Sequence, residues 1–329
     1  MEKSRSGKFV LSLGLILLFV LVFAQVGFAD DLDIGITQIV EHPALDAARQ
    51  GFIDLLEENG YVEGENVKYD IQTAQGEIAN TNTIAQKFAL DNPDLVLAIS
   101  TPSATAVANA IQDIPVLITA VTDPVDAGLV ESAEKPNTNI TGTNDMNPIK
   151  EQVELIQEIV PDLSSVGVIY NAGESNSVLQ VNVVKEVAED LGIKVVEAGI
   201  ASSTEVLTAA NSLVGRVDAI YVPTDNMVVS SIEAVVMVAE ENNIPLIVGE
   251  ESTIEKGALA TLSINYYRLG RQTAEMALKI INGEAVPQDM AIESQNEYSL
   301  ILNVDAAEAM GVVLTEDLLN KADKIIENE

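Results

Sequence analysis

The sequence predicts an α/β protein of two similar lobes, each a doubly wound parallel sheet covered by helices. Strand-like and helix-like segments alternate from residue 33 onward, which is the pattern of right-handed crossovers on a parallel sheet. Hydrophobic residues make up 47% of the 329 residues but aromatic residues only 4%, so Val, Ile, Leu and Ala must fill cores that are covered on both faces. The third observation is an internal similarity between two parts of the chain, which indicates that one design was used twice.

The first series of elements runs from residue 33 to residue 121. An apolar strand is predicted at 33–39, and Pro43 opens the following helix because proline is favoured at the first helical position. Gly60 ends that helix. The same reasoning predicts the remaining elements of this series: strands 67–73, 94–100 and 115–121, and helices 77–90 and 102–111.

A second series begins after residue 143. The segment 94–124 can be aligned with 218–252, since each runs through an Asp, an apolar strand, a turn with Pro and Thr, a helix, an Ile-Pro pair and a second strand. This similarity predicts two lobes of like topology. The elements of the second series are helices 148–160, 177–190, 203–214 and 228–242, and strands 166–170, 193–198, 218–222 and 245–249.

The tail departs from the alternation. A predicted strand at 258–264 leads into an amphipathic helix at 266–282, and Pro287 begins a further extended run to residue 302. Two short helices are predicted near 305–310 and 315–325. No stretch has the composition of a linker, so we expect short connections between the lobes.

The N-terminal segment indicates export. Basic residues precede the apolar run 9–24, and small residues lie at the −3 and −1 positions of a cleavage site after Ala29. We therefore expect residues 1–29 to be a signal peptide. The run is 16 residues long, which is short for a membrane span, and an uncleaved N-terminal anchor is the alternative.

Composition excludes several classes of function. The 51 acidic against 17 basic residues give a formal net charge of −34, which speaks against nucleic acid or an anionic membrane as a partner. The chain has no Cys and His42 is its one histidine, so we expect no metal site and no cofactor. A Ser-His-Asp triad would depend on His42, and no Gly-x-Ser-x-Gly elbow or Gly-rich phosphate loop occurs.

Candidate functional residues lie in six polar loops, each at the point where an apolar strand ends. Ligands of an open parallel sheet bind beyond the carboxyl ends of its strands. The loop 100–103 offers hydroxyls and a helix N-terminus to a carboxylate, although Ser-Thr-Pro-Ser is also a good N-cap. Asp123 and Asp225 occupy matching places in the two halves and are candidate acceptors for a ligand ammonium, although Asp beside Pro also commonly holds a turn. The candidate ligand contacts are Thr37, Gln38, His42, Ser100, Thr101, Ser103, Thr122, Asp123, Asn171, Asn176, Ser177, Thr224, Asp225, Asn226 and Glu250.

These motifs resemble those of ABC-transporter solute-binding proteins of the tryptophan-binding (TrpX-like) type. The segments that carry the resemblance are 36–46, 100–102, 122–130, 170–177 and 223–226. The resemblance implies the type I periplasmic-binding-protein fold, in which a three-crossover hinge joins the lobes. It implies a first lobe of 31–143 with 258–288 and a second lobe of 148–254 with 295–329.

The same resemblance implies a non-catalytic protein that works with an ABC permease and its ATPase outside the cytoplasm. The ligand class that the resemblance implies is an amino acid, with aromatic ones prominent among the relatives. We expect hinge closure to trap this small zwitterion, with Thr101 and Ser103 receiving its carboxylate and Asp123 or Asp225 its ammonium. The six loops contain no Trp or Phe to stack on an aromatic ligand. A nucleoside, sugar or peptide-like solute is the alternative ligand, and an exported hydrolase that uses His42 is the remote alternative function.

Overall fold

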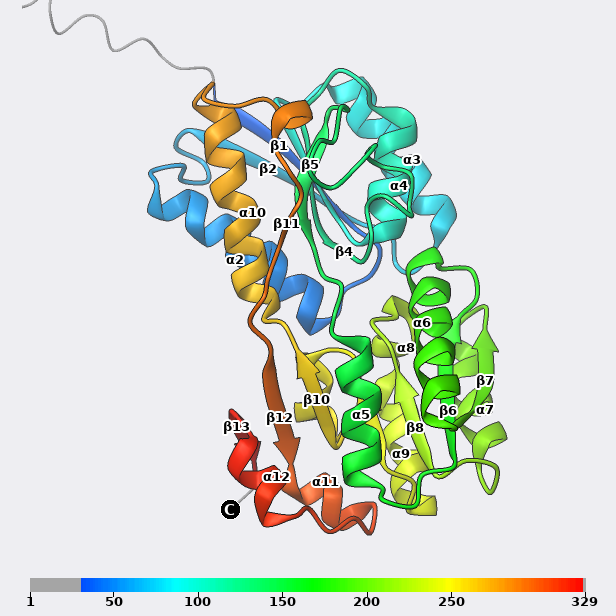
Figure 1. Cartoon of the computed structure of the whole chain (residues 1–329). Helices are drawn as coiled ribbons and strands as arrows, with labels where there is room; N and C mark the ends of the chain where they lie inside the picture. Colours follow the sequence, from blue (N-terminus) through cyan, green and yellow to red (C-terminus); the bar gives the residue numbers. More distant parts are fainter. Residues whose placement is uncertain (1–30, 328–329) are drawn as a thin grey trace, which may run out of the picture.

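The computed structural model describes residues 31–327, and the expected signal peptide lies outside them. Two sheets form two lobes, one above the other in Figure 1. The sheet of the first lobe has six parallel strands in the order β11-β5-β4-β3-β1-β2. Its strands are β1 (Leu32–Gln38), β2 (Val67–Thr73), β3 (Leu95–Ile99), β4 (Val116–Val121), β5 (Ile140–Asn144) and β11 (Glu293–Ser294). Its helices are α2 (Pro43–Glu58), α3 (Ile78–Asp91), α4 (Thr101–Ala110), α10 (Tyr266–Ile281) and the short 3₁₀ helix η3 (Pro287–Asp289).

The sheet of the second lobe has seven strands in the order β13-β12-β10-β9-β8-β6-β7. All neighbours in it are parallel except β10 and β12. Its strands are β6 (Ser165–Asn171), β7 (Lys194–Ile200), β8 (Ala219–Val222), β9 (Leu246–Val248), β10 (Ala260–Ser263), β12 (Ser299–Asn303) and β13 (Lys324–Ile326). Its helices are α5 (Ile149–Ile159), α6 (Ser175–Leu191), α7 (Val206–Leu213), α8 (Asn226–Val229), α9 (Ile232–Asn242), α11 (Val304–Ala309) and α12 (Glu316–Lys321), with 3₁₀ helices η1 (Ser203–Glu205) and η2 (Glu251–Lys256).

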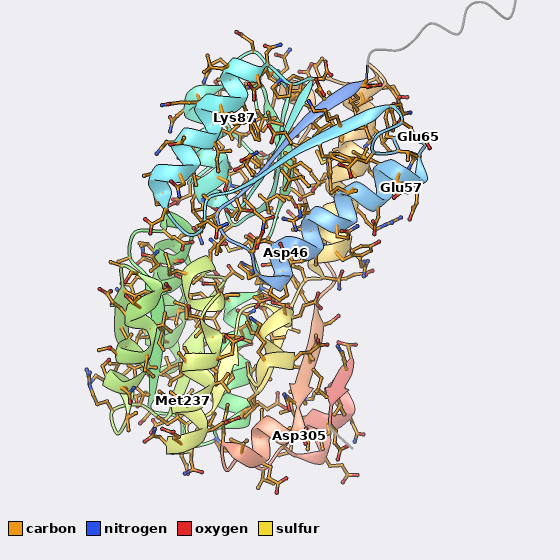
Figure 2. All side chains as sticks on the ribbon, turned by 180° about the vertical axis from the view of Figure 1, so that it is seen from behind. Asp46, Glu57, Glu65, Lys87, Met237 and Asp305 are labelled. Carbon is orange, nitrogen blue, oxygen red and sulfur yellow. The ribbon has the colours of Figure 1, made fainter. Side chains whose placement is uncertain are left out.

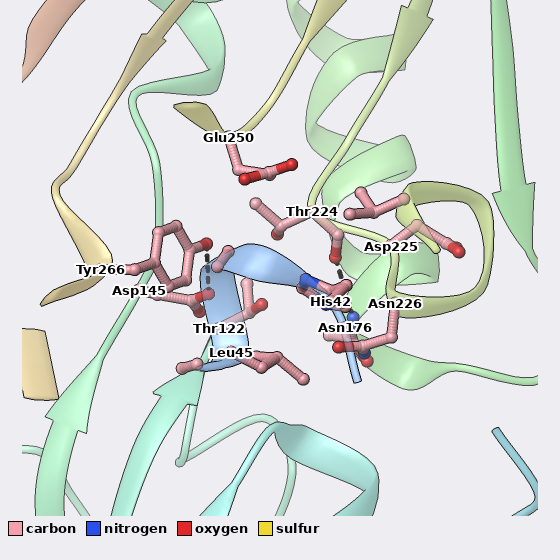
Figure 3. A pocket seen from close by; sticks show the side chains of 13 residues that line it. His42, Leu45, Thr122, Asp145, Asn176, Thr224, Asp225, Asn226, Glu250 and Tyr266 are labelled. Carbon is pink, nitrogen blue, oxygen red and sulfur yellow. Dashed lines mark hydrogen bonds between the residues drawn. The ribbon is translucent and has the colours of Figure 1, made fainter. Parts of the chain in front are cut away.

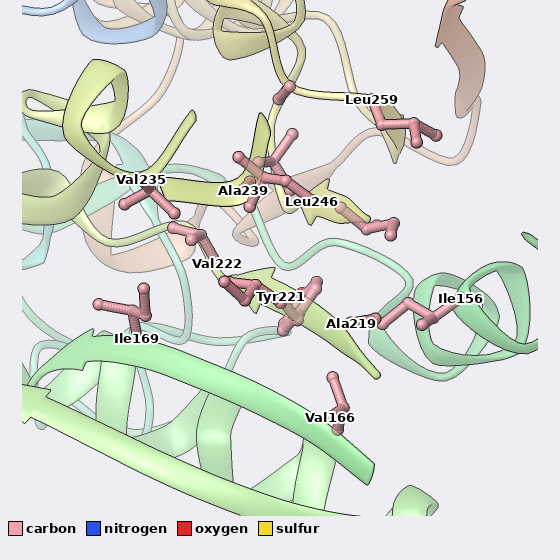
Figure 4. Packing of buried hydrophobic residues seen from close by; sticks show 14 of the residues in the cluster. Ile156, Val166, Ile169, Ala219, Tyr221, Val222, Val235, Ala239, Leu246 and Leu259 are labelled. Atoms are coloured by element: carbon pink, nitrogen blue, oxygen red, sulfur yellow. The ribbon is translucent and has the colours of Figure 1, made fainter. Parts of the chain in front are cut away.

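Each lobe has its own apolar core of aliphatic side chains. All five residues of β3 are buried, as a strand covered by helices on both faces requires. In the second lobe, Tyr221 of β8 is fully buried among Val, Ile and Leu side chains (Figure 4), and its hydroxyl donates to Gln152 Oε1 at 2.5 Å. The prediction of two parallel-sheet lobes is confirmed.

Three segments connect the lobes, and they form the hinge: 145–148 between β5 and α5, 264–265 between β10 and α10, and 295–298 between β11 and β12. The predicted lobe boundaries need one correction. Strand β10 was expected in the first lobe, but it pairs with β9 and β12 of the second. The first lobe takes its second piece from α10 to β11 instead, because α10 packs on α2 and β11 pairs with β5.

Two local predictions were also wrong. The helix expected at 228–242 is divided into α8 and α9, because the chain leaves the helix at Ser230 and restarts with Ser231 as the N-cap. The helix expected at 315–325 ends at Lys321, and the β-branched pair Ile325 and Ile326 extends the sheet beside β12 as β13. Within residues 31–327, no helix has both the length and the apolar character needed to cross a membrane.

Helices α2 and α10 pack against each other at two glycines, and they lie side by side in Figure 1. A Cβ on Gly270 would lie 1.8 Å from the carbonyl oxygen of Ala48, and one on Gly51 would lie 2.1 Å from that of Tyr267. The backbones therefore touch directly. Both helices begin at the boundary between the lobes, where Figure 2 shows Asp46 in the first turn of α2.

Candidate ligand site between the lobes

A cavity lies between the lobes, at the carboxyl ends of both sheets (Figure 3). Its volume is about 20 Å³, which is room for about one water molecule. This is too little room for an amino acid, so the lobes must move apart to admit one. The residues that line the cavity are His42, Ala44, Leu45, Ala120, Thr122, Asp145, Asn176, Thr224, Asp225, Asn226, Val229, Glu250 and Tyr266.

Five of the six predicted loops contribute to this cavity. The predicted residues among its lining are His42, Thr122, Asn176, Thr224, Asp225, Asn226 and Glu250. The predicted residues outside its lining are Thr37, Gln38, Ser100, Thr101, Ser103, Asp123, Asn171 and Ser177. A second inter-lobe pocket of about 320 Å³ is lined by Asn171 and Met227 together with residues 75–79 of the first lobe and 200–203 of the second.

The loop after β3 differs most from its prediction. Ser100 stands at the N-cap of α4, but its side chain makes no capping hydrogen bond, and its φ of 83° is rare for a residue other than glycine. Ser100 and Ser103 face each other at 3.5 Å, and the Thr101 hydroxyl is buried without a partner. The expected side-chain cap is therefore absent, and the loop does not reach the cavity.

Two other predicted contacts hold their own lobe together. Gln38 receives a hydrogen bond from Arg49 and donates to Asp46, so it ties β1 to α2. Asp123 accepts the backbone N–H groups of Val125 and Asp126, which is the turn role that Asp beside Pro commonly has.

Asp225 lines the cavity, yet donors of its own lobe occupy both of its carboxylate oxygens. Oδ1 accepts the N–H of Val228 as the N-cap of α8, and Oδ2 accepts the N–H of Asn171 at 2.5 Å and the Ser177 hydroxyl at 2.7 Å. Burial raises the pKa of Asp225, and these donors oppose the rise. Its main contribution is to join the loops that follow β6 and β8.

Asn226 is oriented by a buried acid behind it. Its amide nitrogen donates to Glu174 Oε2, and Asn171 donates to the other oxygen at 3.3 Å. Burial and the neighbouring Asp225 charge raise the pKa of Glu174. Asn226 therefore presents its carbonyl oxygen on the cavity side, toward His42.

His42 is the N-cap residue of α2 and is 7% exposed. Neither ring nitrogen has a partner with hydrogen-bond geometry among the described residues, although Asn226 lies close enough to raise the pKa slightly. Burial dominates and lowers the pKa of His42 to about 4. The imidazole is neutral near pH 7 and has one donor and one acceptor free for a ligand.

Glu250 follows β9 and lies at the top of the cavity in Figure 3. Its oxygens accept the N–H group and the hydroxyl of Ser252, at 2.8 and 2.9 Å. Burial raises the pKa of Glu250 to about 7. Like Asp225, it caps a turn of its own lobe while presenting a carboxylate to the cavity.

The sequence reasoning missed two hinge residues. Asp145 follows β5 on the first connection, and Tyr266 begins α10 after the second. The Tyr266 hydroxyl donates to Asp145 Oδ2 at 2.8 Å, which Figure 3 shows as a dashed line. Among residues 31–327, Oδ1 of Asp145 has no partner with hydrogen-bond geometry, although the Thr122 hydroxyl is close enough to lower the pKa. Burial dominates and raises the pKa of this carboxyl to about 6. The signal in the sequence was a polar step after a strand, but β5 is too rich in Thr and Gly to have been predicted as one.

A β-bulge brings the end of β4 to the cavity. The register with β5 shifts between Ile118 and Val121, and Ala120 within the bulge has a φ of 53°. Bulges re-aim side chains next to functional sites, at some cost in backbone strain. Here the bulge places Ala120 and Thr122 on the cavity wall.

The cavity is acidic. Three carboxylates line it, and none of its lining residues is Lys or Arg. Within residues 31–327, no cluster of His, Asp and Glu is suited to hold a metal ion. The chemistry of the cavity therefore matches an organic ligand that carries an ammonium group, with apolar contacts from Leu45, Val229 and Tyr266.

Comparison with known proteins agrees with this geometry. Residues 33–326 match the family model of the ABC transporter substrate binding protein. The chain is 47% identical over 278 residues to a tyrosine-binding protein of Clostridioides difficile (strain R20291), an alignment that covers 84% of this chain and 80% of that protein.

Two solved structures bear on the arrangement of the lobes. The ABC domain from Streptococcus pneumonia in complex with L-Trp is 33% identical with a TM-score of 0.87, covering 90% of this chain and 100% of that one. The ligand-free, open structure of a substrate binding protein with adhesive properties from Clostridium difficile is 49% identical, yet its TM-score is 0.68, with 91% and 100% covered. The lobes here are thus arranged more like those of the L-Trp complex than like those of the open structure. The chain belongs to the ABC transporter substrate-binding proteins and has their type I periplasmic-binding-protein fold.

Proposed function

We propose that this protein captures an L-amino acid with a large apolar side chain, tyrosine or tryptophan foremost, for import by an ABC transporter. The observation that carries the proposal is the inter-lobe cavity, whose walls combine acidic, N–H-donating and apolar groups. The names of the relatives that bind tyrosine and L-Trp support the same ligand class.

The carboxylate of the ligand has a matching site at the start of α2. This helix has 16 residues, Pro43 in its first turn and no side-chain cap, and its next two residues, Ala44 and Leu45, line the cavity. The first N–H groups of a helix have no partner within it, and the helix dipole favours an anion there. We place the ligand carboxylate at these N–H groups, with His42 beside it, in preference to the loop 100–103.

The aromatic ring of the ligand would lie among Leu45, Val229 and Tyr266. Tyr266 supplies the aromatic wall that the six strand-end loops lack. Tyr170 and Tyr221 do not serve in this way, because Tyr170 donates to Glu197 and Tyr221 is buried in the core.

The remaining parts of the proposal concern the setting. The protein would act outside the cytoplasm after export by residues 1–29, and would deliver its ligand to a membrane permease driven by a cytosolic ATPase. It would have no catalytic activity. The neutral His42, whose ring nitrogens contact no serine hydroxyl within residues 31–327, supports a binding role over hydrolysis.

Isothermal titration calorimetry on the mature protein tests the ligand class. We expect saturable 1:1 binding of L-tyrosine or L-tryptophan, and much weaker binding of glycine and L-alanine because they leave the apolar wall uncovered. The panel includes nucleosides, sugars and a dipeptide. Binding of one of these in place of every amino acid would refute the proposal, as would hydrolysis of a generic ester that His42→Ala abolishes.

A further inference from the structure

The three carboxylates that line the cavity differ in how many of their oxygens already accept hydrogen bonds. Asp225 is engaged at both oxygens by Val228, Asn171 and Ser177. Glu250 is engaged at both oxygens by Ser252. Each of these two acids would have to share acceptors that already hold its own loop in place.

Asp145 differs from both. It is 4% exposed and lines the cavity, and among residues 31–327 its buried Oδ1 has no partner with hydrogen-bond geometry, although the Thr122 hydroxyl is close enough to lower the pKa. A buried carboxylate oxygen without a well-formed hydrogen bond costs free energy, unless a ligand supplies the donor. An ammonium group has three donors and the complementary charge.

The backbone around Asp145 holds that oxygen in place. Its N–H donates to the carbonyl oxygen of Val121 at 3.2 Å, and the Tyr266 hydroxyl holds Oδ2 at 2.8 Å. Two residues on, Asn147 Oδ1 accepts the N–H of Ile264, so the first and second hinge connections are tied together. Asp145 therefore lies on a connection between the lobes that is hydrogen-bonded to the second connection.

We propose that Asp145 is the residue that receives the ammonium group of the ligand, and that Tyr266 is the positioning residue that aims its free oxygen into the cavity. This inference rests on the proposed function, since it requires a ligand with an ammonium group. It assigns amino-acid selectivity to the hinge rather than to Asp123 or Asp225 at the strand ends.

The ligand pair that tests this is L-tyrosine and its deaminated analogue, 3-(4-hydroxyphenyl)propanoate, which differ in the ammonium group. Calorimetry on the wild type should show a strong preference for L-tyrosine. In Asp145→Asn, affinity for L-tyrosine should fall about 100-fold, as expected when one partner of a buried charged pair is removed. Affinity for the analogue should change by less than about threefold, so the preference disappears.

Tyr266→Phe keeps the ring and removes the hydroxyl. We expect affinity for L-tyrosine to fall about 10-fold, with a smaller change for the analogue, because Asp145 loses the group that aims it. Glu241→Gln, at an exposed acid on α9, is the matched control that removes one negative charge outside the cavity, and both affinities should stay unchanged.

The pH dependence of binding is a second readout on the wild type. Burial raises the pKa of Asp145 to about 6, so acidification through pH 6 should weaken L-tyrosine binding more than binding of the analogue. Glu250 lines the same cavity and burial raises its pKa to about 7, so its titration would also change the preference for an ammonium group. The same ratio of affinities is therefore measured in Glu250→Gln, where a fall of the ratio on acidification reports Asp145.

The outcomes separate the two proposals. If the wild type binds no amino acid, the proposed function and this inference both fail. If it binds L-tyrosine but Asp145→Asn keeps the preference over the analogue, the inference alone fails. If Asp145→Asn does not fold, an affinity ratio that stays constant in Glu250→Gln from pH 5 to pH 8 overturns it.

Discussion

The close contact between α2 and α10 predicts that a substitution which usually stabilises a helix destabilises this protein. Gly270→Ala would ordinarily stabilise a helix by about 1 kcal/mol, because alanine has the higher helix propensity. In this protein the added methyl group would lie 1.8 Å from the carbonyl oxygen of Ala48. We therefore expect the substitution to destabilise the protein.

The geometry sets the size of the effect. An ordinary contact of 3.4 Å requires the two helices to separate by about 1.6 Å at this point, against a carbonyl oxygen that is fixed within α2. Forcing an extra methyl group into a well-packed interior costs about 1–3 kcal/mol or more. After the gain in helix propensity is subtracted, we expect a net loss of about 2 kcal/mol. Gly51→Ala, which meets Tyr267 at 2.1 Å, should behave alike.

Urea unfolding followed by circular dichroism measures this loss. Glu275→Ala, at an exposed position of α10, is the control and should change the free energy of unfolding by less than about 0.5 kcal/mol. Separation of the helices would also shift Tyr266, one turn before Gly270, so affinity for L-tyrosine should fall in the same variant. A Gly270→Ala protein as stable as the wild type, or more stable, would refute the direct backbone contact.

Three further predictions concern single residues. Gly142→Ala in β5 places a methyl group 2.1 Å from the Ile118 carbonyl oxygen, at a residue whose φ is 140°. The free energy of unfolding should therefore fall by about 3 kcal/mol. An unchanged urea midpoint would contradict this. Asp225→Ala removes the acceptor of three donors in its own lobe, so the free energy of unfolding in the same assay should fall by about 3 kcal/mol. A fall below about 1 kcal/mol would show that the Asp225 carboxylate does not join the loops that follow β6 and β8. Burial raises the pKa of Glu250 from 4.5 to about 7, so the folded state holds a proton that the unfolded state has released, and ligand-free stability falls as pH rises from about 4.5 to about 7. In Glu250→Gln that fall should be smaller by about 3 kcal/mol, and pH profiles of the melting temperature identical to those of the wild type would disprove the assignment.

The lobes could be predicted from the sequence because their signals are local. An apolar run that ends in a polar loop marks a strand and its carboxyl end, and parallel sheets bring such ends to one edge. For this reason His42, Thr224 and Asn226, which were predicted in such loops, line the cavity. The resemblance placed three crossovers in the hinge, but it assigned β10 to the wrong lobe, since which sheet a four-residue strand joins depends on tertiary pairing.

The direction in which each side chain points could not be predicted from the sequence. Ser100 turns away through a φ of 83°, which a serine rarely adopts and no local pattern signals. Ala120 and Thr122 face the cavity because of a bulge, whose presence depends on the pairing of β4 with β5. Asp145 and Tyr266 lie 121 positions apart in the chain. Only the crossing of the hinge segments brings them within hydrogen-bond distance.

The buried acids also give a physical reason for the lobes to close on a ligand. In the closed arrangement, Asp145 and Glu250 are buried together in a cavity without a lining Lys or Arg, and the raised pKa of each reflects that cost. Opening the lobes returns both carboxylates to water, so the ligand-free protein gains from the open state. An ammonium group compensates the buried charge only when the lobes are closed around it. A ligand shifts a conformational equilibrium by its difference in affinity for the two states, and under the proposal for Asp145 that difference would come from charge neutralisation at the hinge.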